Sequence, residues 1–250
     1  MRALILSDIH ANLDALDAVL NAAPEHEVVW NLGDIVGYGG NPNEVIERVR
    51  GLGTVFVRGN HDRVCCGLTA AVDFNAVAAR AARWTQAVLT PENVLWLQHL
   101  AQGPVKPDGP RVSCMHGSLV DEDEYMFSMR DACQPLRDAA THLNFFGHTH
   151  MQGGFAANGE TLSKVQPVYY LRDKGEEYEV HLDPEVRYML NPGSVGQPRD
   201  YDWRAAFAIY DDVFETVRFF RVPYDVRAAQ ASILRAGLPD RLATRLREGR

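Results

Sequence analysis

Two histidines separated by one residue follow a glycine in the stretch NFFGHTHMQ at residues 144–152. A neutral imidazole is a common ligand of transition metals, and its pKa near neutrality also suits proton transfer. His148 and His150 are therefore candidates for metal binding or for acid–base chemistry. If the pair stood alone, an ordinary surface position at the end of a strand would explain it. The arrangement recurs along the chain, however, and that recurrence weakens the simpler interpretation.

Four earlier segments also end in side chains that can bind metals. Apolar stretches at 3–10, 28–34, 54–62 and 111–117 each pass into a polar turn. The residues at these ends whose side chains can bind metals are Asp8, His10, Asp34, Asn60, His61 and His116. In open α/β sheets, functional groups gather beyond the carboxyl ends of the strands. We therefore expect these side chains to converge with His148 and His150 in one site.

The elements that must position these residues are predicted from hydrophobic patterning. The apolar segments lack alternation, which is typical of strands buried on both faces. Between them, apolar residues recur at helical spacing, and caps mark two helix starts, Asn12 before one helix and Asn41-Pro42 before the next. The predicted helices cover 13–20, 42–49, 70–89 and 91–100. Strands that alternate with helices predict a largely parallel sheet.

The second half of the chain has a different pattern. Short strand-like segments joined by tight turns predict a mainly antiparallel second sheet, with strands at 165–171, 176–182, 186–191, 205–210 and 213–222. The tail 225–247 predicts two short amphipathic helices broken at 237–239. No linker is visible. We therefore expect one domain over 1–250, with a metal-ligand half at 1–150, a second-sheet half at 151–224 and a helical tail at 225–250.

Composition and charge narrow the classes of function. The formal net charge of −8 argues against binding to long nucleic acids, which requires clustered lysine and arginine. No apolar run approaches the ~20 residues that span a bilayer, and the amino-terminal sequence does not resemble a secretory signal. The four cysteines form no C-x-x-C pair, so we expect reduced thiols in a cytoplasmic protein.

The ordered set of strand-end residues resembles the calcineurin-like metallophosphoesterase superfamily, particularly its small bacterial members. The family signature D-x-H, G-D, G-N-H-D/E, H and G-H-x-H is represented by Asp8-Ile9-His10, Gly33-Asp34, Gly59-Asn60-His61-Asp62, His116 and Gly147-His148-Thr149-His150. The match is close over 1–150 and less specific at 190–200. The resemblance implies a four-layer αββα sandwich with two mixed sheets and a dinuclear metal centre at its edge.

The resemblance also assigns the ligands of the two metal ions. It implies that one ion is held by Asp8, His10, Asp34 and His150, and the other by Asp34, Asn60, His116 and His148, so that Asp34 bridges them. Imidazoles mixed with oxygen ligands suit Mn, Fe or Zn better than Mg or Ca, and we expect Mn. Two divalent ions, two carboxylates and a bridging hydroxide leave a net positive centre, which suits attack on an anionic phosphoryl group.

His61 stands outside the ligand set, because its neighbour Asn60 fills that role. A histidine beside the metals is suited to be the general acid for the leaving oxygen, and the resemblance implies that role or stabilisation of the transition state. Asp62 could orient His61 or cap the following turn.

The chain departs from the pattern of the superfamily's protein phosphatases after the second motif. There the motif continues as G-D-x-x-D-R-G, whereas Gly37 and Tyr38 occupy the positions of the second Asp and the Arg here. A phosphodiester carries less negative charge than a monoester and needs fewer cations. We therefore predict a phosphodiesterase for small substrates, with a small-molecule or nucleotide phosphomonoesterase as the alternative. Arg199 could return a cation to the site or be a surface arginine at a turn, and Tyr38 could contact the substrate or only anchor its loop.

Two further interpretations complete the sequence-based expectations. The acidic run Asp121-Glu122-Asp123-Glu124 is most simply a solvated turn, although beside the cleft it would repel long polyanions. A non-catalytic interaction scaffold of the same fold is a third possibility, which every filled ligand position disfavours. The oligomeric state is left open by the sequence.

Overall fold

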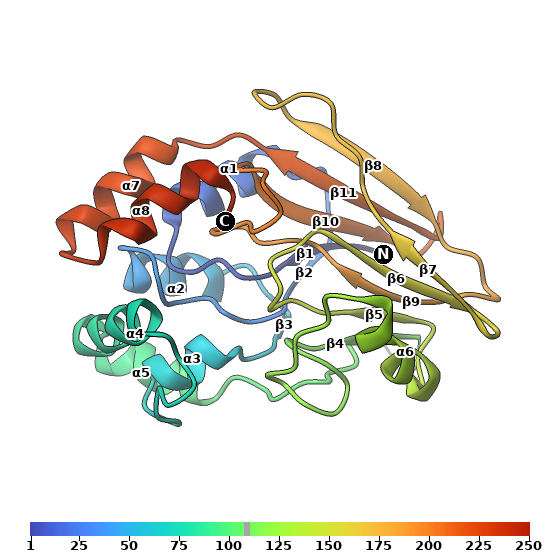
Figure 1. The fold of residues 1–250 in the computed structure, drawn as a ribbon, viewed down its shortest axis with the longest axis horizontal. Coiled ribbons are helices and arrows are strands. Elements are labelled where there is room, and N and C mark those ends of the chain that lie inside the picture. Colours follow the sequence, from blue (N-terminus) through green and yellow to red (C-terminus); the bar gives the residue numbers. More distant parts are fainter. Residues whose placement is uncertain (108–110) are drawn as a thin grey trace.

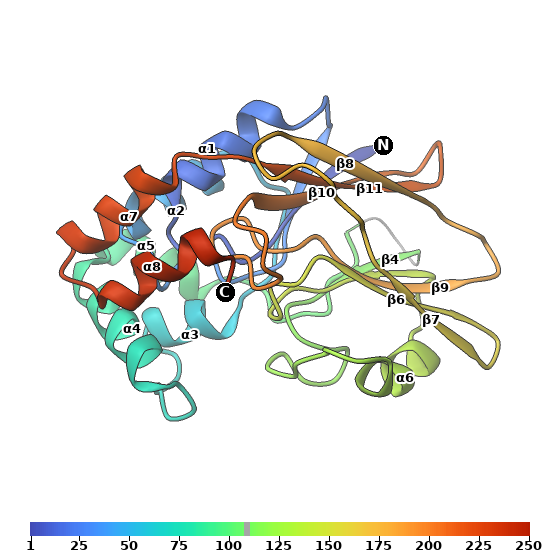
Figure 2. The same ribbon diagram turned by 45° about the horizontal axis from the view of Figure 1, so that its top comes forward.

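Two β-sheets lie face to face in the computed structural model, with helices on both outer surfaces (Figures 1 and 2). The structure describes residues 1–107 and 111–250. The first sheet has the order β3-β2-β1-β10-β11-β8. Its strands are β3 (Val55–Phe56), β2 (Val28–Asn31), β1 (Arg2–Leu6), β10 (Ala205–Asp211), β11 (Thr216–Val222) and β8 (Glu176–His181). The second sheet, in its order, comprises β4 (Val112–Cys114), β5 (Leu143–Phe145), β9 (Arg187–Asn191), β6 (Gly153–Asn158) and β7 (Thr161–Val165).

Helices cover the two sheets unequally. In Figure 1, one helix lies against the second sheet, while the others gather at the opposite side of the molecule. The single helix is α6 (Met129–Asp138). The others are α1 (Leu13–Ala22), α2 (Pro42–Arg50), α3 (Asn60–Cys65), α4 (Ala76–Val88), α5 (Pro91–Gln98), α7 (Val226–Arg235) and α8 (Asp240–Glu248). No described helix is both long enough and apolar enough to cross a membrane.

Strand β1 shows why the layers stack in this way. Leu4 and Leu6 pack into the core beneath the helices, whereas Ala3 and Ile5 pack into the core between the two sheets. Because successive side chains of a strand point to opposite faces, a strand buried on both faces must be apolar throughout. A third core, which includes Leu136 of α6, lies beyond the second sheet. The three cores define four layers, and the predicted αββα sandwich is confirmed.

The partition of strands between the sheets differs from the prediction. The five strands of the first 150 residues do not form one sheet, because β1, β2 and β3 belong to the first sheet and β4 and β5 to the second. Similarly, the strands after residue 150 do not form a separate sheet. β10 pairs antiparallel with β1, and β9 pairs parallel with β5. These pairs join strands that are far apart in the sequence. The local hydrophobic pattern does not show which distant strands pair.

Most predicted helices are present. Asn12 caps α1 through a side-chain hydrogen bond from the backbone amide of Ala15 at 3.1 Å, as the sequence predicts. Pro42 begins α2, although the Asn41 side chain makes no capping bond. The tail forms α7 and α8 with the predicted break between them. Helices α3 and α6 were not expected from the pattern.

The strand prediction fails at one place after residue 150. A hairpin of β6 and β7 spans 153–165, and the segment 166–171 is not a strand. The sequence GGFAAN of β6 has few residues with high β propensity, whereas Tyr169 and Tyr170 gave the following segment a strand-like composition. Pro167 cannot donate a backbone hydrogen bond to a ladder, which explains why that segment is excluded from the sheet.

Candidate metal centre

The predicted ligands come together where the strands of the two sheets end. Asp8 and His10 follow β1, and Asp34 follows β2. His116 follows β4, while His148 and His150 follow β5. Two clusters of possible metal ligands result, and both contain Asp34. The site therefore forms where the strand ends of two sheets meet. The ligands do not follow five neighbouring strands of one sheet.

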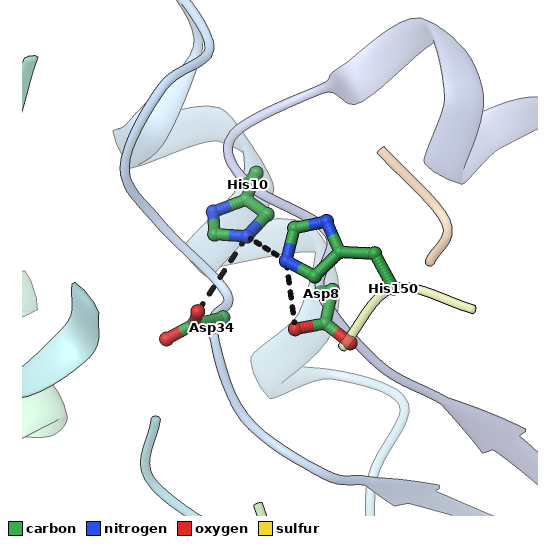
Figure 3. A group of neighbouring side chains, drawn as sticks. All are labelled: Asp8, His10, Asp34 and His150. Atoms are coloured by element: carbon green, nitrogen blue, oxygen red, sulfur yellow. Dashed lines mark hydrogen bonds and ion pairs between the residues drawn. The ribbon is translucent and has the colours of Figure 1, made fainter. Parts of the chain in front are cut away.

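The first cluster consists of Asp8, His10, Asp34 and His150 (Figure 3). The Nε2 atoms of His10 and His150 lie 3.1 Å apart. Each imidazole also faces a carboxylate, with His10 Nε2 at 3.5 Å from Asp34 and His150 Nε2 at 3.3 Å from Asp8. All four side chains are at most 1% exposed.

The second cluster consists of Asp34, His116 and His148. The Nε2 of His116 is 3.5 Å from Asp34 Oδ2 and 3.1 Å from His148 Nδ1. Asn60 borders this cluster at the start of α3. Its Oδ1 is buried and has no hydrogen-bond partner. Such an orphaned oxygen is costly unless a ligand satisfies it, which fits the role that the resemblance implies for Asn60.

Backbone carbonyls orient every imidazole of the two clusters. The partners, which can only accept a hydrogen bond, are the carbonyl of Val36 for His10 Nδ1, Leu32 for His116 Nδ1, Gln197 for His150 Nδ1 and Asp123 for His148 Nε2. The nitrogen facing each carbonyl must therefore carry the proton. In a neutral ring, the other nitrogen then presents a lone pair to the cluster, as in a metal-ligating histidine.

The spacing of the donor atoms also fits metal ions. Metal–nitrogen bonds of about 2.0–2.1 Å place neighbouring ligand atoms roughly 3–3.5 Å apart. The ligand separations given above, from 3.1 to 3.5 Å, lie in that range. The clusters are thus suitable for two metal ions that share Asp34, and the mixed imidazole and oxygen donors suit Mn, Fe or Zn.

The backbone at the centre adopts a conformation that is rare for side-chain-bearing residues. Asp8, His10, Asp34, His148 and His150 all have φ between 50° and 65°. This left-handed region costs of order 1 kcal/mol or more for each such residue. Five ligands held in it indicate that packing and hydrogen bonds around the loops impose the geometry of the centre.

The charges of the second cluster are strongly coupled. Burial alone would raise the pKa of Asp34, but the charge of His116 and its hydrogen bond hold it well below its usual range. Burial would likewise lower the pKa of His116, yet Asp34 raises it to about 9. Without metal, His116 and Asp34 therefore form an ion pair at neutral pH.

The other ligands respond mainly to burial. Burial lowers the pKa of His10 and His150 well below the ordinary value, and it lowers that of His148 to about 3 with the help of the His116 charge. These three rings are therefore neutral at pH 7 and available as ligands. Burial raises the pKa of Asp8 to about 7, since it disfavours the charged form.

His61 lies beside the clusters and outside them. Its ring contacts the rings of His10 and Tyr38, with centroids 4.9 and 4.3 Å away. A Cβ on Gly37 would approach His61 Nδ1 to 2.4 Å, so only glycine leaves room for the imidazole there. Burial lowers the pKa of His61 to about 4. The neutral ring can donate a hydrogen bond to a leaving oxygen without first being protonated.

Asp62 serves the loops rather than His61. Its Oδ1 accepts hydrogen bonds from the backbone amides of Ile35 and Val36, and its Oδ2 accepts one from Gly59. Within the described chain, no hydrogen bond joins Asp62 to His61. The sequence left open whether Asp62 orients His61 or caps the following turn. Its bonds instead go to amides that precede it, so Asp62 positions the loop after β2 and the start of α3.

Tyr38 and Arg199 lie next to each other at the edge of the centre. The Tyr38 ring is 4.6 Å from that of His10, and the Arg199 guanidinium carbon lies 5.9 Å from the Tyr38 centroid. The Arg199 charge also contributes to lowering the pKa of His150 and opposes the rise at Asp8. The structure therefore places a cation beside the centre.

A pocket of ≈ 530 Å³ opens onto the second cluster. Its walls include Asn60, His61, Phe74, Tyr125 and His148. Sequence reasoning missed Tyr125, which stacks on His148 with ring centroids 3.8 Å apart. No local motif marks this tyrosine, because the loop that carries it is brought to the site by tertiary packing.

The acidic run at 121–124 is not simply a solvated turn. Arg58 donates two hydrogen bonds to Glu122, at 2.8 and 2.9 Å, and Arg63 pairs with Asp123. These ion pairs hold the loop at the site, where the Asp123 carbonyl orients His148. With Glu122 and Asp123 paired in this way, the run contributes to positioning of the second cluster.

Comparison with known proteins identifies relatives of the whole chain. The family model of the calcineurin-like phosphoesterase superfamily domain matches residues 1–212. An uncharacterized protein of Methanocaldococcus jannaschii is 34% identical over 251 residues, which cover 98% of this chain and 97% of that protein. A symmetrical bis(5′-nucleosyl)-tetraphosphatase of Yersinia enterocolitica is 31% identical over 103 residues, covering 39% of this chain and 35% of that enzyme.

Solved structures agree with these relationships. The crystal structure of a metallophosphoesterase from Sphaerobacter thermophilus is 40% identical in sequence and has a TM-score of 0.84, with 100% of this chain and 99% of that chain covered. A hypothetical protein from Pyrococcus horikoshii shares the fold at 19% identity, with a TM-score of 0.77 and coverage of 100% and 98%.

Proposed function

Because the chain belongs to the calcineurin-like phosphoesterase superfamily, we propose that it is a metal-dependent phosphodiesterase that acts on small phosphodiesters. Membership makes the protein a hydrolase of phosphate esters. Our proposal adds the preference for diesters, the identity of the metal and the roles of individual residues.

One observation carries the proposal. Four imidazoles, each tied through one nitrogen to a backbone carbonyl, direct their other nitrogen toward the space around Asp34. In a merely structural cluster these nitrogens would face donors, yet in the first cluster the unprotonated Nε2 atoms of His10 and His150 face each other and the carboxylates of Asp34 and Asp8. Convergent lone pairs and carboxylates are instead the arrangement that metal ions require.

In this proposal the ligands fall into two sets that share Asp34. One set is Asp8, His10, Asp34 and His150, and the other is Asp34, Asn60, His116 and His148. Two divalent ions, Mn above all and Fe or Zn as alternatives, would activate water and neutralise the charge of a phosphoryl group when bound. The chain itself fixes the ligands and shapes the pocket that admits the ester.

His61 is the residue that we assign to the leaving oxygen. It lines the pocket between Tyr38 and Phe74, and its ring is not needed in either ligand set. Its low pKa favours a neutral ring that donates a hydrogen bond as charge develops on that oxygen. Transition-state stabilisation thus replaces full proton donation as the proposed role.

The runner-up function is hydrolysis of small phosphomonoesters, including nucleotides. Arg199 favours this alternative, because a monoester dianion benefits from an additional cation and Arg199 stands over Tyr38 at 5.9 Å. The absence of the phosphatase aspartate and arginine, replaced by Gly37 and Tyr38, favours the diester.

Turnover of paired chromogenic esters tests the proposal. Protein reconstituted with Mn²⁺ is assayed with bis(p-nitrophenyl) phosphate and p-nitrophenyl phosphate, before and after treatment with EDTA. We expect faster turnover of the diester, loss of it in EDTA, and loss of it in His150→Ala. The matched control is His181→Ala, since the His181 side chain is 79% exposed and remote from the ligand sets. A monoester preference would establish the runner-up, and no turnover with Mn²⁺, Fe²⁺ or Zn²⁺ would support a non-catalytic scaffold.

We further propose that residues 1–250 form one domain, because strands from both halves of the chain are neighbours within the same sheets. The four cysteines are free, which is compatible with the reducing conditions of the cytoplasm. Small esters rather than long nucleic acids fit a net charge of −8.

A further inference from the structure

A second pocket adjoins the metal centre on the side of the C-terminal helix. It has a volume of ≈ 760 Å³ and is bounded by α8 and by the first turn of α4. Tyr38 and Asn75 line both this pocket and the one that opens onto the second cluster. The two pockets therefore meet at Tyr38, whose ring also contacts His10 of the first cluster.

Arginines dominate the charged groups of this pocket. Arg241, Arg245 and Arg250 line it, and Glu248 is the carboxylate among its walls. Glu248 pairs with Arg250 at 3.7 Å. Within the described chain, Arg241 and Arg245 have no side-chain carboxylate as a partner. Among the charged side chains of the pocket, three arginines thus stand against one carboxylate.

Arg245 and Arg199 approach the same aromatic ring. Each guanidinium carbon lies 5.9 Å from the Tyr38 centroid. Arg245 donates through Nε to the Arg250 carbonyl, while the Nε of Arg199 is buried without a partner. Burial, reinforced by the Arg199 charge, lowers the pKa of Arg245 to about 10. Two half-buried like charges that face one ring repel each other, and a bound anion would relieve that repulsion.

We infer that Arg245, with Arg241, forms a subsite for a second phosphoryl group, so that the preferred substrates carry a phosphate beyond the one that is hydrolysed. This inference rests on the proposed function, which places the reacting phosphate at the metal centre. Tyr38 separates the two positions by a single ring. Helix α8 lies outside the residues matched by the family model, so the subsite is an addition to the shared centre.

The subsite is tested by comparing two inorganic anions. Inorganic phosphate and inorganic tripolyphosphate are titrated by calorimetry into wild type, Arg245→Gln, Arg245→Lys and Arg247→Gln, each with Mn²⁺ and metal-free. Arg247 is the matched control, because it lies on the same helix but does not line the pocket. Any chelation of Mn²⁺ by tripolyphosphate is common to all four proteins and is absent from the metal-free titrations.

We expect Arg245→Gln to weaken binding of tripolyphosphate by about 10- to 100-fold, the usual worth of a hydrogen bond from a charged donor. The affinity of Arg245→Gln for phosphate should differ from that of wild type by less than about 3-fold. Arg247→Gln should bind both anions like wild type. The affinity of Arg245→Lys for tripolyphosphate should lie between those of wild type and Arg245→Gln. Equal weakening of both anions, or equal effects of Arg245→Gln and Arg247→Gln, would overturn the inference. Thermal unfolding shows whether each variant is folded. If Arg245→Gln is not folded, the affinity of Arg245→Lys for tripolyphosphate decides.

Turnover of bis(p-nitrophenyl) phosphate is measured on the same samples. This ester has one phosphate and does not need the subsite, so its turnover by wild type and by the control Arg247→Gln reports on the metal centre alone. Failure of wild type to hydrolyse it would contradict the proposed function, while the tripolyphosphate titrations would still decide the subsite.

Discussion

The two ligand clusters share Asp34 but differ in how the fold encloses them. The first cluster is sealed, with His10 and His150 each 1% exposed and neither lining the large pocket beside the centre. The second cluster opens to that pocket through Asn60 and His148. The difference teaches that the first cluster is part of the protein interior, whereas the second borders the pocket in which our proposal places the substrate.

The largest effect is expected from the one residue that both clusters use. Asp34→Asn removes the shared negative charge while keeping an oxygen that can accept the hydrogen bond from the His61 amide. We expect loss of both ions and a fall in turnover of about 10⁴-fold or more, as several kcal/mol of electrostatic stabilisation disappear. Elemental analysis and steady-state kinetics measure the two effects. Retention of one full equivalent of metal would show that the clusters are independent.

A smaller effect is expected from His61, which belongs to neither cluster. His61→Ala should retain both ions and slow turnover by about 10²–10⁴-fold, the usual contribution of one group that assists the leaving oxygen. Phe74→Leu is the control, because Phe74 packs on the His61 ring at 4.4 Å without offering a polar group. Loss of a metal from His61→Ala would assign this histidine to a ligand set.

The pH dependence of metal binding should separate the clusters. In the metal-free protein the pKa of His116 is raised to about 9, so an ion in the second cluster must displace a proton below that pH. The first cluster has no such competitor above the Asp8 pKa of about 7, because the pKa values of His10 and His150 are lowered.

Between pH 7 and 9, affinity for the second ion should therefore rise by about tenfold per pH unit, while affinity for the first stays level. Calorimetric titration with Mn²⁺ from pH 7.0 to 8.5 in buffers of different ionisation enthalpy measures both the affinities and the proton release. Two affinities that rise in parallel would refute the distinction between the clusters.

The smallest effect concerns the rate at which a chelator removes the ions. EDTA should remove the ion of the open second cluster first, giving two phases that differ by about tenfold or more. His148→Ala should accelerate the fast phase alone, and His150→Ala the slow phase alone, because each belongs to a different cluster. Release followed with a metallochromic indicator tests this. A single phase for wild type would mean that burial does not distinguish the two sites.

Local sequence signals sufficed to predict the ligands of both clusters. The ligands follow the ends of apolar strands within two to five residues, so their types and their convergence could be predicted. Local signals also sufficed for α1, α2 and the broken tail, where Asn12, Pro42 and residues 237–239 mark helix boundaries.

Features that depend on distant packing could not be predicted. The pairing of β1 with β10 decides which strands share a sheet, and no local pattern encodes it. In the same way Tyr125 covers His148, and Arg245 reaches Tyr38 from the far end of the chain. The role of Asp62 became visible only with its three backbone partners.

The anchoring of the imidazoles by main-chain carbonyls has a consequence for how this protein can change over evolution. A carbonyl survives most substitutions of the residue that bears it, so replacing the side chains of Leu32, Val36, Asp123 or Gln197 need not release the ring that each carbonyl holds. The walls of the pocket, by contrast, are made of side chains such as Tyr38, Phe74 and Tyr125. Point mutations in the pocket can therefore change substrate selectivity while the geometry of the metal centre is retained.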